Sequence, residues 1–125
     1  MCAINGCTFK DEELARLMNA ETKHRGPDGS RVWSADGITL AQNRMAIIDL
    51  SDASAQPMHS KDGRYVMIYN GELYNFKELK KEIGENRFTT SGDTEVILEA
   101  YLKWGKSCVE KFNGLFALAI WDTKT

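Results

Sequence analysis

Two segments of the chain are expected to form strands whose side chains are apolar on both faces. Residues 65–69 read YVMIY and residues 115–121 read LFALAIW, and neither alternates between apolar and polar side chains. Strands of this kind must be covered on both sides. Two architectures meet this requirement: stacked layers in the order helix, sheet, sheet, helix, or a single sheet with helices on both faces. The pattern alone leaves both open.

The other strands are shorter and more polar. One is expected at residues 3–8, and two more at residues 31–34 and 38–43. The last two flank the tripeptide Ala35-Asp36-Gly37, and Asp-Gly between strand-like runs is a strong hairpin signal. We therefore expect these two strands to pair directly.

Helices are expected at residues 11–22, 75–83 and 91–104. Asn75 is placed to cap the second of them. In the first helix the apolar residues Leu14, Leu17 and Met18 form a stripe at helical spacing. In the second, Phe76, Leu79 and Ile83 share a face. In the third, the spacing predicts that one side is buried against a sheet, and this side consists of Val96, Ile97, Ala100, Tyr101 and Trp104.

Composition excludes several classes of protein. The chain has 16 basic and 18 acidic residues, without the basic stripe that nucleic-acid binding requires, and no apolar run long enough to span a membrane. Cys2, Cys7 and Cys108 are odd in number and lack a disulfide pattern, which favours the cytoplasm. Neither His24 nor His59 has a convincing ligand spacing, so no metal site is expected.

Cys2 directly follows the initiator methionine. If Met1 is removed, the α-amine of Cys2 lies within reach of its own thiol. Such an amine has an ordinary pKa of about 7.7 to 8.0 and can accept the thiol proton without a histidine. This is how amino-terminal nucleophiles are activated. The competing interpretation is a small apolar residue in a buried strand.

Polar residues at the ends of predicted elements could complete a site around Cys2. Asn70-Gly71 follows YVMIY, where a sharp turn could aim an amide and an N–H at one developing oxyanion; an ordinary turn is the alternative. Arg44 follows a strand, and its guanidinium suits a carboxylate. Asp93, in the first turn of a helix, and Glu72 could pair with an ammonium group. Each has a plain surface role as its alternative.

A series of motifs, in order along the whole chain, resembles the glutaminase domain of the glutamine-hydrolysing asparagine synthetases. Any one of them is weak, whereas together they are highly specific. The motifs are MCAINGC (1–7), KHRGPDG (23–29), RMAIIDL (44–50), AQPM (55–58), YNGELYN (69–75), SGDTEVIL (91–98) and NGLFALAIWD (113–122).

The resemblance implies a fold and a set of roles. The fold is an α+β four-layer αββα sandwich, that of the amino-terminal-nucleophile (Ntn) hydrolases. Cys2 resembles the nucleophile and its base, and Asn70 with the N–H of Gly71 resembles the oxyanion hole. Arg44 resembles the group that binds the glutamine α-carboxylate, and Asp93 with Glu72 the site for the α-ammonium. The pocket-lining segment corresponds to Met45, Ala46, Ile47 and Ile48, with methionine where the family more often has leucine.

The resemblance also implies what lies outside residues 1–125. Family members continue through further strands and into a synthetase domain that adenylates aspartate with ATP and magnesium. We therefore expect residues 1–125 to be an incomplete glutaminase domain that needs no cofactor, with glutamine and the synthetase domain as partners. A homodimer is left open.

Two alternatives remain at this stage. One is a catalytically silent fragment that binds glutamine or a partner. The other is the glutaminase domain of another class II amidotransferase, one that makes amino sugars or purine precursors. HRGPD and YNGELYN favour the asparagine synthetase type.

Overall fold

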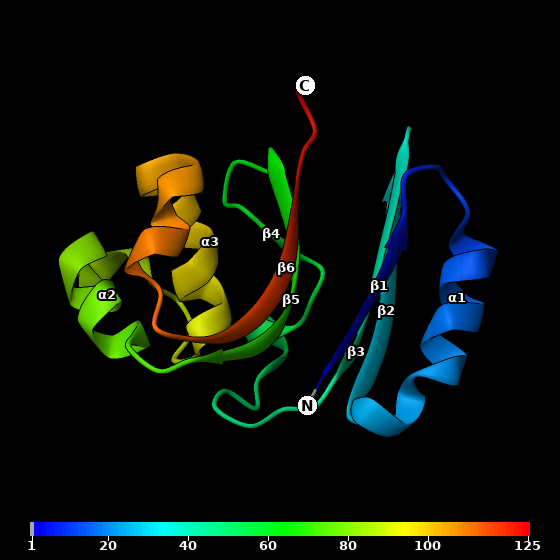
Figure 1. Cartoon of the computed structure of the whole chain (residues 1–125), viewed down its shortest axis with the longest axis horizontal. Coiled ribbons are helices and arrows are strands. Elements are labelled where there is room, and N and C mark those ends of the chain that lie inside the picture. Colours follow the sequence, from blue (N-terminus) through cyan, green and yellow to red (C-terminus); the bar gives the residue numbers. More distant parts are fainter. Residues whose placement is uncertain (1) are drawn as a thin grey trace.

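Two antiparallel sheets lie face to face with helices outside them in the computed structural model, which describes residues 2–125 (Figure 1). The first sheet contains, in spatial order, β1 (Ala3–Cys7), β3 (Ile38–Arg44) and β2 (Gly29–Ala35). The second contains β4 (Met58–His59), β5 (Tyr65–Leu73) and β6 (Gly114–Asp122). The four-layer prediction is confirmed, and the single-sheet alternative is wrong.

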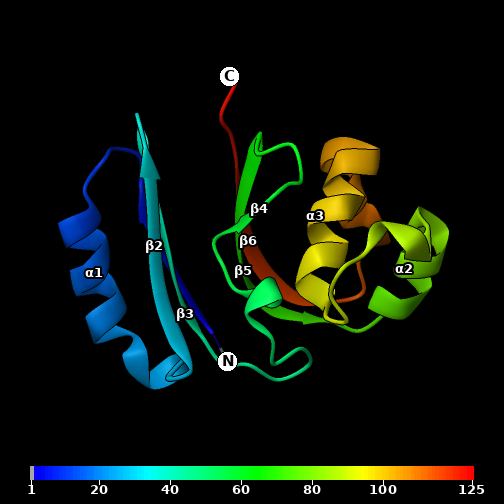
Figure 2. The ribbon, with the colours of Figure 1, turned by 180° about the vertical axis from the view of Figure 1, so that it is seen from behind.

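Helices cover only the outer faces of the sheets (Figure 2). On the first sheet lies α1 (Glu12–Glu21), and on the second lie α2 (Phe76–Ile83) and α3 (Asp93–Trp104). Short 3-10 segments lie in the connections between helices and strands: η1 (Lys23–Arg25), η2 (Asp52–Ser54), η3 (Glu85–Arg87) and η4 (Gly105–Lys111). Among residues 2–125, no helix has the length and apolar character needed to cross a membrane.

The predicted β2–β3 hairpin is confirmed. Ala35 pairs with Ile38, so Asp36 and Gly37 form the turn, where Gly37 has φ +81°. Only glycine adopts this conformation without a steric penalty. On the other side of β3, Ala3 pairs with Asn43, which places Cys2 next to the end of β3.

The two leucines of the α1 stripe do not face the sheet. Leu17 is 60% exposed and Leu14 is also exposed, whereas Ala15 and Asn19 are buried against the sheet. Asn19 receives a hydrogen bond from Asn5 of β1 at 2.9 Å, and its backbone carbonyl accepts one from the Asn43 amide at 2.7 Å. These polar contacts rotate α1 so that its leucines face outward.

The packing of α2 and α3 on the second sheet is mainly apolar. Met67 on β5 and Val96 and Ile97 on α3 are fully buried, and α3 is buried on all sides from Asp93 to Ala100. The predicted face of α3 is thus confirmed, and so is the apolar face of α2, where Leu79 and Ile83 are buried. A smaller apolar cluster between the two sheets is formed by Ile38, Leu40, Val66 and Ile68.

The chain does not turn at Asn70-Gly71 as predicted. β5 continues through both residues to Leu73, and they pair with Ala117 and Phe116 of β6. A side chain at Gly71 would place its Cβ 2.0 Å from the carbonyl oxygen of Leu115. The glycine is needed here for close approach of a neighbouring strand, and not for a turn.

Two further local predictions are wrong. The first half of β6 is not covered on both faces, since Leu115 is 65% exposed and Phe116 38%. This strand is an edge of the second sheet. Asn75 precedes α2, but its side chain makes no capping bond; it donates to the carbonyl of Lys111 and accepts from the N–H of Asn113.

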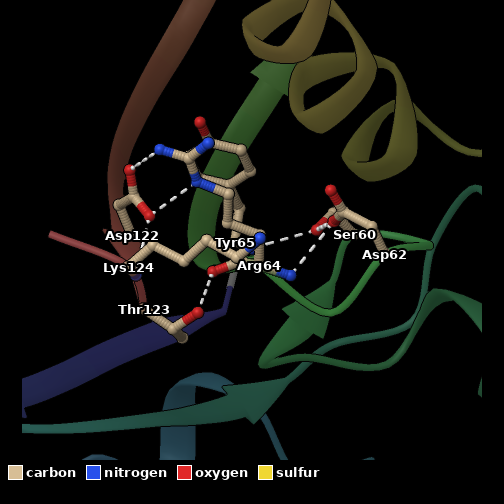
Figure 3. A network of polar contacts seen from close by, with 7 residues as sticks. All are labelled: Ser60, Asp62, Arg64, Tyr65, Asp122, Thr123 and Lys124. Carbon is tan, nitrogen blue, oxygen red and sulfur yellow. Dashed lines mark hydrogen bonds and ion pairs between the residues drawn. The ribbon is translucent and has the colours of Figure 1, made fainter.

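Polar contacts join the start of β5 to the end of β6 (Figure 3). Arg64 donates two hydrogen bonds to the Asp122 carboxylate, at 2.8 and 2.7 Å, and its carbonyl accepts from the Thr123 N–H and hydroxyl. Asp62 accepts from Ser60 and from the Arg64 N–H. These bonds tie the β4–β5 connection to the end of β6.

Candidate active site

One pocket brings together every residue of the site predicted from the sequence. Both sheets contribute, because Cys2 precedes β1, Arg44 ends β3, and Asn70 lies within β5. The pocket encloses about 640 Å³, including space open to solvent. The predicted residues that line it are Cys2, Arg44, Met45, Ala46, Ile47, Ile48, Asn70, Gly71, Glu72 and Asp93. Their roles stay predictions.

The sulfur of Cys2 lies against the loop that follows β3. The N–H of Met45 donates to Cys2 Sγ at 3.3 Å, and Met45 O lies 3.7 Å from the same sulfur. Arg25 Nε donates to the Cys2 carbonyl at 3.3 Å. These three contacts hold Cys2 at the pocket wall. Met1 lies outside the described residues, so its removal also stays a prediction.

The KHRGPDG loop (residues 23–29) contacts the end of β3 and the loop that follows it. At Gly26 a Cβ would lie 2.4 Å from the carbonyl of Asn43, so no side chain fits there. Asp28 accepts from the Ala46 N–H at 2.9 Å, and its own N–H donates to the Arg44 carbonyl at 2.9 Å. Sequence reasoning assigned this loop no role of its own, although its motif was the available signal.

Arg44 closes the loop to which it belongs. Its guanidinium donates to the carbonyl of Ser51 at 2.8 Å and to the carbonyl of Asp49. A guanidinium carries more N–H groups than these two contacts use. Arg44 can therefore hold the loop and still offer donors to a carboxylate in the pocket.

Asp93 is the first residue of α3 and is 7% exposed. Its Oδ2 accepts from the hydroxyl of Tyr69 at 2.8 Å and from the N–H of Leu73 at 3.0 Å. Burial, and then the negative charge of Asp93, raise the pKa of Tyr69 well above its usual value. The phenol therefore stays protonated and orients the carboxylate. Sequence reasoning missed Tyr69 because it read YVMIY as apolar.

Unpaired polar atoms on the pocket wall favour a polar ligand. Among residues 2–125, the buried Asn70 Oδ1 and Gln42 Oε1 have no hydrogen-bond partner. Most buried polar atoms do have partners, so such exceptions in one pocket need an explanation. Glu72, by contrast, is exposed at the same pocket. A ligand with an amide and charged groups would match this distribution. The described residues contain no cluster of three or more His, Cys, Asp or Glu suited to a metal.

The fold is shared with a solved amidotransferase. The glutamine phosphoribosylpyrophosphate amidotransferase from B. subtilis, complexed with ADP and GMP, superposes with a TM-score of 0.75. The likeness covers 98% of this chain and 35% of that one, at 16% sequence identity. The likeness shows the fold alone, a four-layer arrangement of the Ntn type.

Sequence relatives are asparagine synthetases. The chain is 37% identical to asparagine synthetase [glutamine-hydrolyzing] 3 of Bacillus subtilis, over 99% of this chain and 22% of the relative. It is 39% identical to asparagine synthetase B [glutamine-hydrolyzing] of Escherichia coli, over 90% of this chain and 20% of the relative. The chain thus spans about a fifth of the length of these relatives.

A family-level match covers the same span. The sequence profile described as "Glutamine amidotransferase domain" matches residues 1–125, which is the whole chain. Together with the fold, with the relatives and with a pocket built around Cys2, this match shows that the chain belongs to the glutamine amidotransferase domain family.

Proposed function

We propose that this pocket hydrolyses the side-chain amide of glutamine, with Cys2 as the nucleophile once Met1 has been removed. The observation that carries the proposal is the shared pocket, in which the Cys2 sulfur, the Asn70 amide and the charged pair Arg44 and Asp93 all take part. These groups match a thiol attack on an amide that is held by its zwitterionic end.

The proposed reaction has two halves. The α-amine of Cys2 accepts the thiol proton, the sulfur attacks the amide carbon, and the amine returns the proton to the leaving nitrogen. Ammonia departs and a thioester remains. Water then attacks the thioester, which releases glutamate and restores the thiol. Asn70 and the N–H of Gly71 would hold the oxyanion in both halves.

Binding would use the two charged ends of glutamine. Arg44 would bind the α-carboxylate, while Asp93, with Glu72 at the exposed edge, would bind the α-ammonium. Asp93 is already fixed by Tyr69 and Leu73, so its carboxylate would not need to be ordered when substrate arrives. The loop at Met45–Ile48 would form the wall beside the substrate chain.

The acceptor of the ammonia is proposed from the relatives. Their names describe glutamine-hydrolysing asparagine synthetases, and this chain spans about a fifth of them. We propose that the ammonia serves an ATP-dependent amidation of aspartate in a synthetase domain of a longer protein. Residues 1–125 would then use no cofactor of their own, and ATP and magnesium would belong to that other domain.

The direct test replaces the nucleophile. Cys2→Ala should abolish ammonia release from glutamine, because no other thiol lines the pocket among the described residues. Cys7→Ala is the matched control and should keep parent activity, since Cys7 lies at the far end of β1 from Cys2. Ammonia release by Cys2→Ala at the parent rate would overturn the assignment.

A second comparison tests the free amine. Matched samples with and without Met1 would be treated with an electrophilic glutamine analogue, and the adduct would be located by peptide mass spectrometry. With Met1 attached, the Cys2 nitrogen is an amide and cannot accept a proton, so only the Met1-free sample should be labelled. Equal labelling would overturn self-activation. Glutamine binding without turnover in the Met1-free sample would favour the silent binding fragment.

A further inference from the structure

A carboxylate outside the predicted site joins two walls of the pocket. Asp49 Oδ1 accepts from the Ser51 N–H at 2.8 Å and from the Ser51 hydroxyl at 2.5 Å. Asp49 Oδ2 accepts from the Ser91 N–H at 2.9 Å and from the Ser91 hydroxyl at 3.2 Å. The contact with Ser91 bridges segments 42 residues apart in the chain.

The two joined segments carry the charged groups of the site. Asp49 lies in the loop that begins at Arg44, whose guanidinium donates to the carbonyl of Asp49 itself. Ser91 precedes α3, which begins at Asp93. Gly92 lies between Ser91 and Asp93 in the sequence. A Cβ at this position would lie 3.3 Å from Asp49 Cβ, so the two segments approach closely.

Hydrogen bonds hold the loop in place. Its apolar side chains are exposed, with Ile47 60% exposed, Ile48 45% and Leu50 75%. Apolar burial therefore contributes little to anchoring it. The first part of the loop is held by the contacts of Met45 with Cys2 and of Ala46 with Asp28, and the second part by those of Asp49 and Arg44.

We propose that Asp49 is a positioning residue for the substrate: it sets the separation between Arg44 and Asp93, and thereby the fit of the two charged ends of glutamine. This inference rests on the proposed function for the identity of the ligand. Asp49 need not touch the substrate or the reacting atoms.

The charge of Asp49 is needed for this role. The bond from the Ser51 hydroxyl, followed by those from the Ser91 and Ser51 N–H groups, lowers the pKa of Asp49 far below its usual range. Only an ionised carboxylate accepts at both oxygens. An asparagine would turn its NH₂ toward one of the two serines, where the backbone N–H is also a donor. One side of the bridge would then be lost.

The test compares two neighbouring acids, Asp49→Asn and Asp52→Asn. Asp52 is the matched control because it lies in the same connection and its side chain is 93% exposed. In Met1-free protein, Asp49→Asn should raise KM for glutamine about 10- to 100-fold, the loss expected for charge-assisted hydrogen bonds, and change kcat by less than about threefold. Asp52→Asn should change neither.

Two readouts separate positioning from collapse of the site. Alkylation of Cys2 by iodoacetamide needs no zwitterion contact, so its rate should stay within about twofold of the parent in Asp49→Asn. Ser91→Ala removes one hydroxyl but keeps the N–H donor, so its KM should fall between those of the parent and Asp49→Asn. An unchanged KM in Asp49→Asn would overturn the inference, and so would a matching loss of kcat and alkylation.

A binding measurement separates this inference from the proposed reaction. Calorimetric titration of glutamine into Cys2→Ala and into Cys2→Ala with Asp49→Asn needs no turnover. A weaker affinity in the double variant supports the role of Asp49 even if the parent releases no ammonia, an outcome that would overturn only the hydrolysis. Equal affinity in the two proteins overturns the role of Asp49.

Discussion

The helices α1 and α3 each cover one sheet, but they are held there by different interactions. On α3 the contacts are apolar, with Val96 and Ile97 fully buried against β5. On α1 the buried positions include Asn19, whose amide donates to the Ser30 hydroxyl at 3.1 Å and to the Arg31 carbonyl at 3.2 Å. We call the packing of α3 on the second sheet the apolar layer, because apolar burial dominates it. We call the packing of α1 on the first sheet the polar layer, because matched hydrogen bonds dominate it.

The difference shows how stability and precision are divided in this fold. Apolar burial is non-directional and contributes most of the folding free energy. Hydrogen bonds contribute less net energy, but they are directional and costly when one partner is lost. The polar layer lies behind β1 and β3, the strands that place Cys2 and Arg44. We infer that it fixes the register of these strands, while the apolar layer keeps the molecule folded.

The largest effect should come from the apolar layer. Ile97→Ala should lower the free energy of unfolding by about 2 to 5 kcal/mol, since Ile97 is fully buried and a cavity would remain. Leu17→Ala, on the exposed face of α1, should change it by less than about 0.5 kcal/mol. Urea unfolding measures both. A similar loss in the two variants would remove the contrast between the helices.

An intermediate effect is expected from the polar layer. Asn19→Ala should cost about 1 to 3 kcal/mol, because the amide of Asn5 would lose one of its two acceptors and keep only the Thr22 hydroxyl, in a partly buried site. Asn86→Ala, at an exposed position, is the control and should be nearly neutral. The measurement is again urea unfolding. A neutral Asn19→Ala would mean that the hydrogen bonds of this layer are dispensable.

The smallest effect belongs to the Arg64–Asp122 pair, a polar contact at the end of the second sheet (Figure 3). The bond from Arg64 lowers the pKa of Asp122 to about 2, below its value in an unfolded chain. A lowered folded-state pKa adds stability above the unfolded pKa, and this is lost as the pH falls through the folded pKa. The stability difference between parent and Asp122→Asn should therefore be constant from about pH 5 to 7 and shrink as the pH falls from about 5 to 1. A difference at pH 2 as large as that at pH 6 would contradict this.

Sequence patterns predicted the apolar layer well and the polar layer poorly. Periodicity found the buried face of α3, because apolar burial depends on side-chain type and spacing. The same spacing in α1 does not mark its buried face, because Leu14 and Leu17 face outward. The contact that decides the outcome, between Asn5 and Asn19, joins two elements and leaves no periodic signal.

The site was predicted from its motifs more completely than from local geometry. Asn70 and Gly71 were placed correctly in the pocket, but the expected turn is a strand, since their conformation depends on pairing with β6. Asp49 was missed even though it lies within a recognised motif. Its partner Ser91 is distant in the chain, and only the folded structure shows that the two segments meet.

The register of β1 limits where the chain can be altered for laboratory use. Because Ala3 pairs with Asn43, a one-residue insertion or deletion within the first strand would exchange the inner and outer faces of the residues on one side of the change. Thr125 lies at the opposite end of the molecule from the start of β1 (Figure 1). Affinity handles and fluorophores attached at Thr125 would therefore lie away from the start of β1.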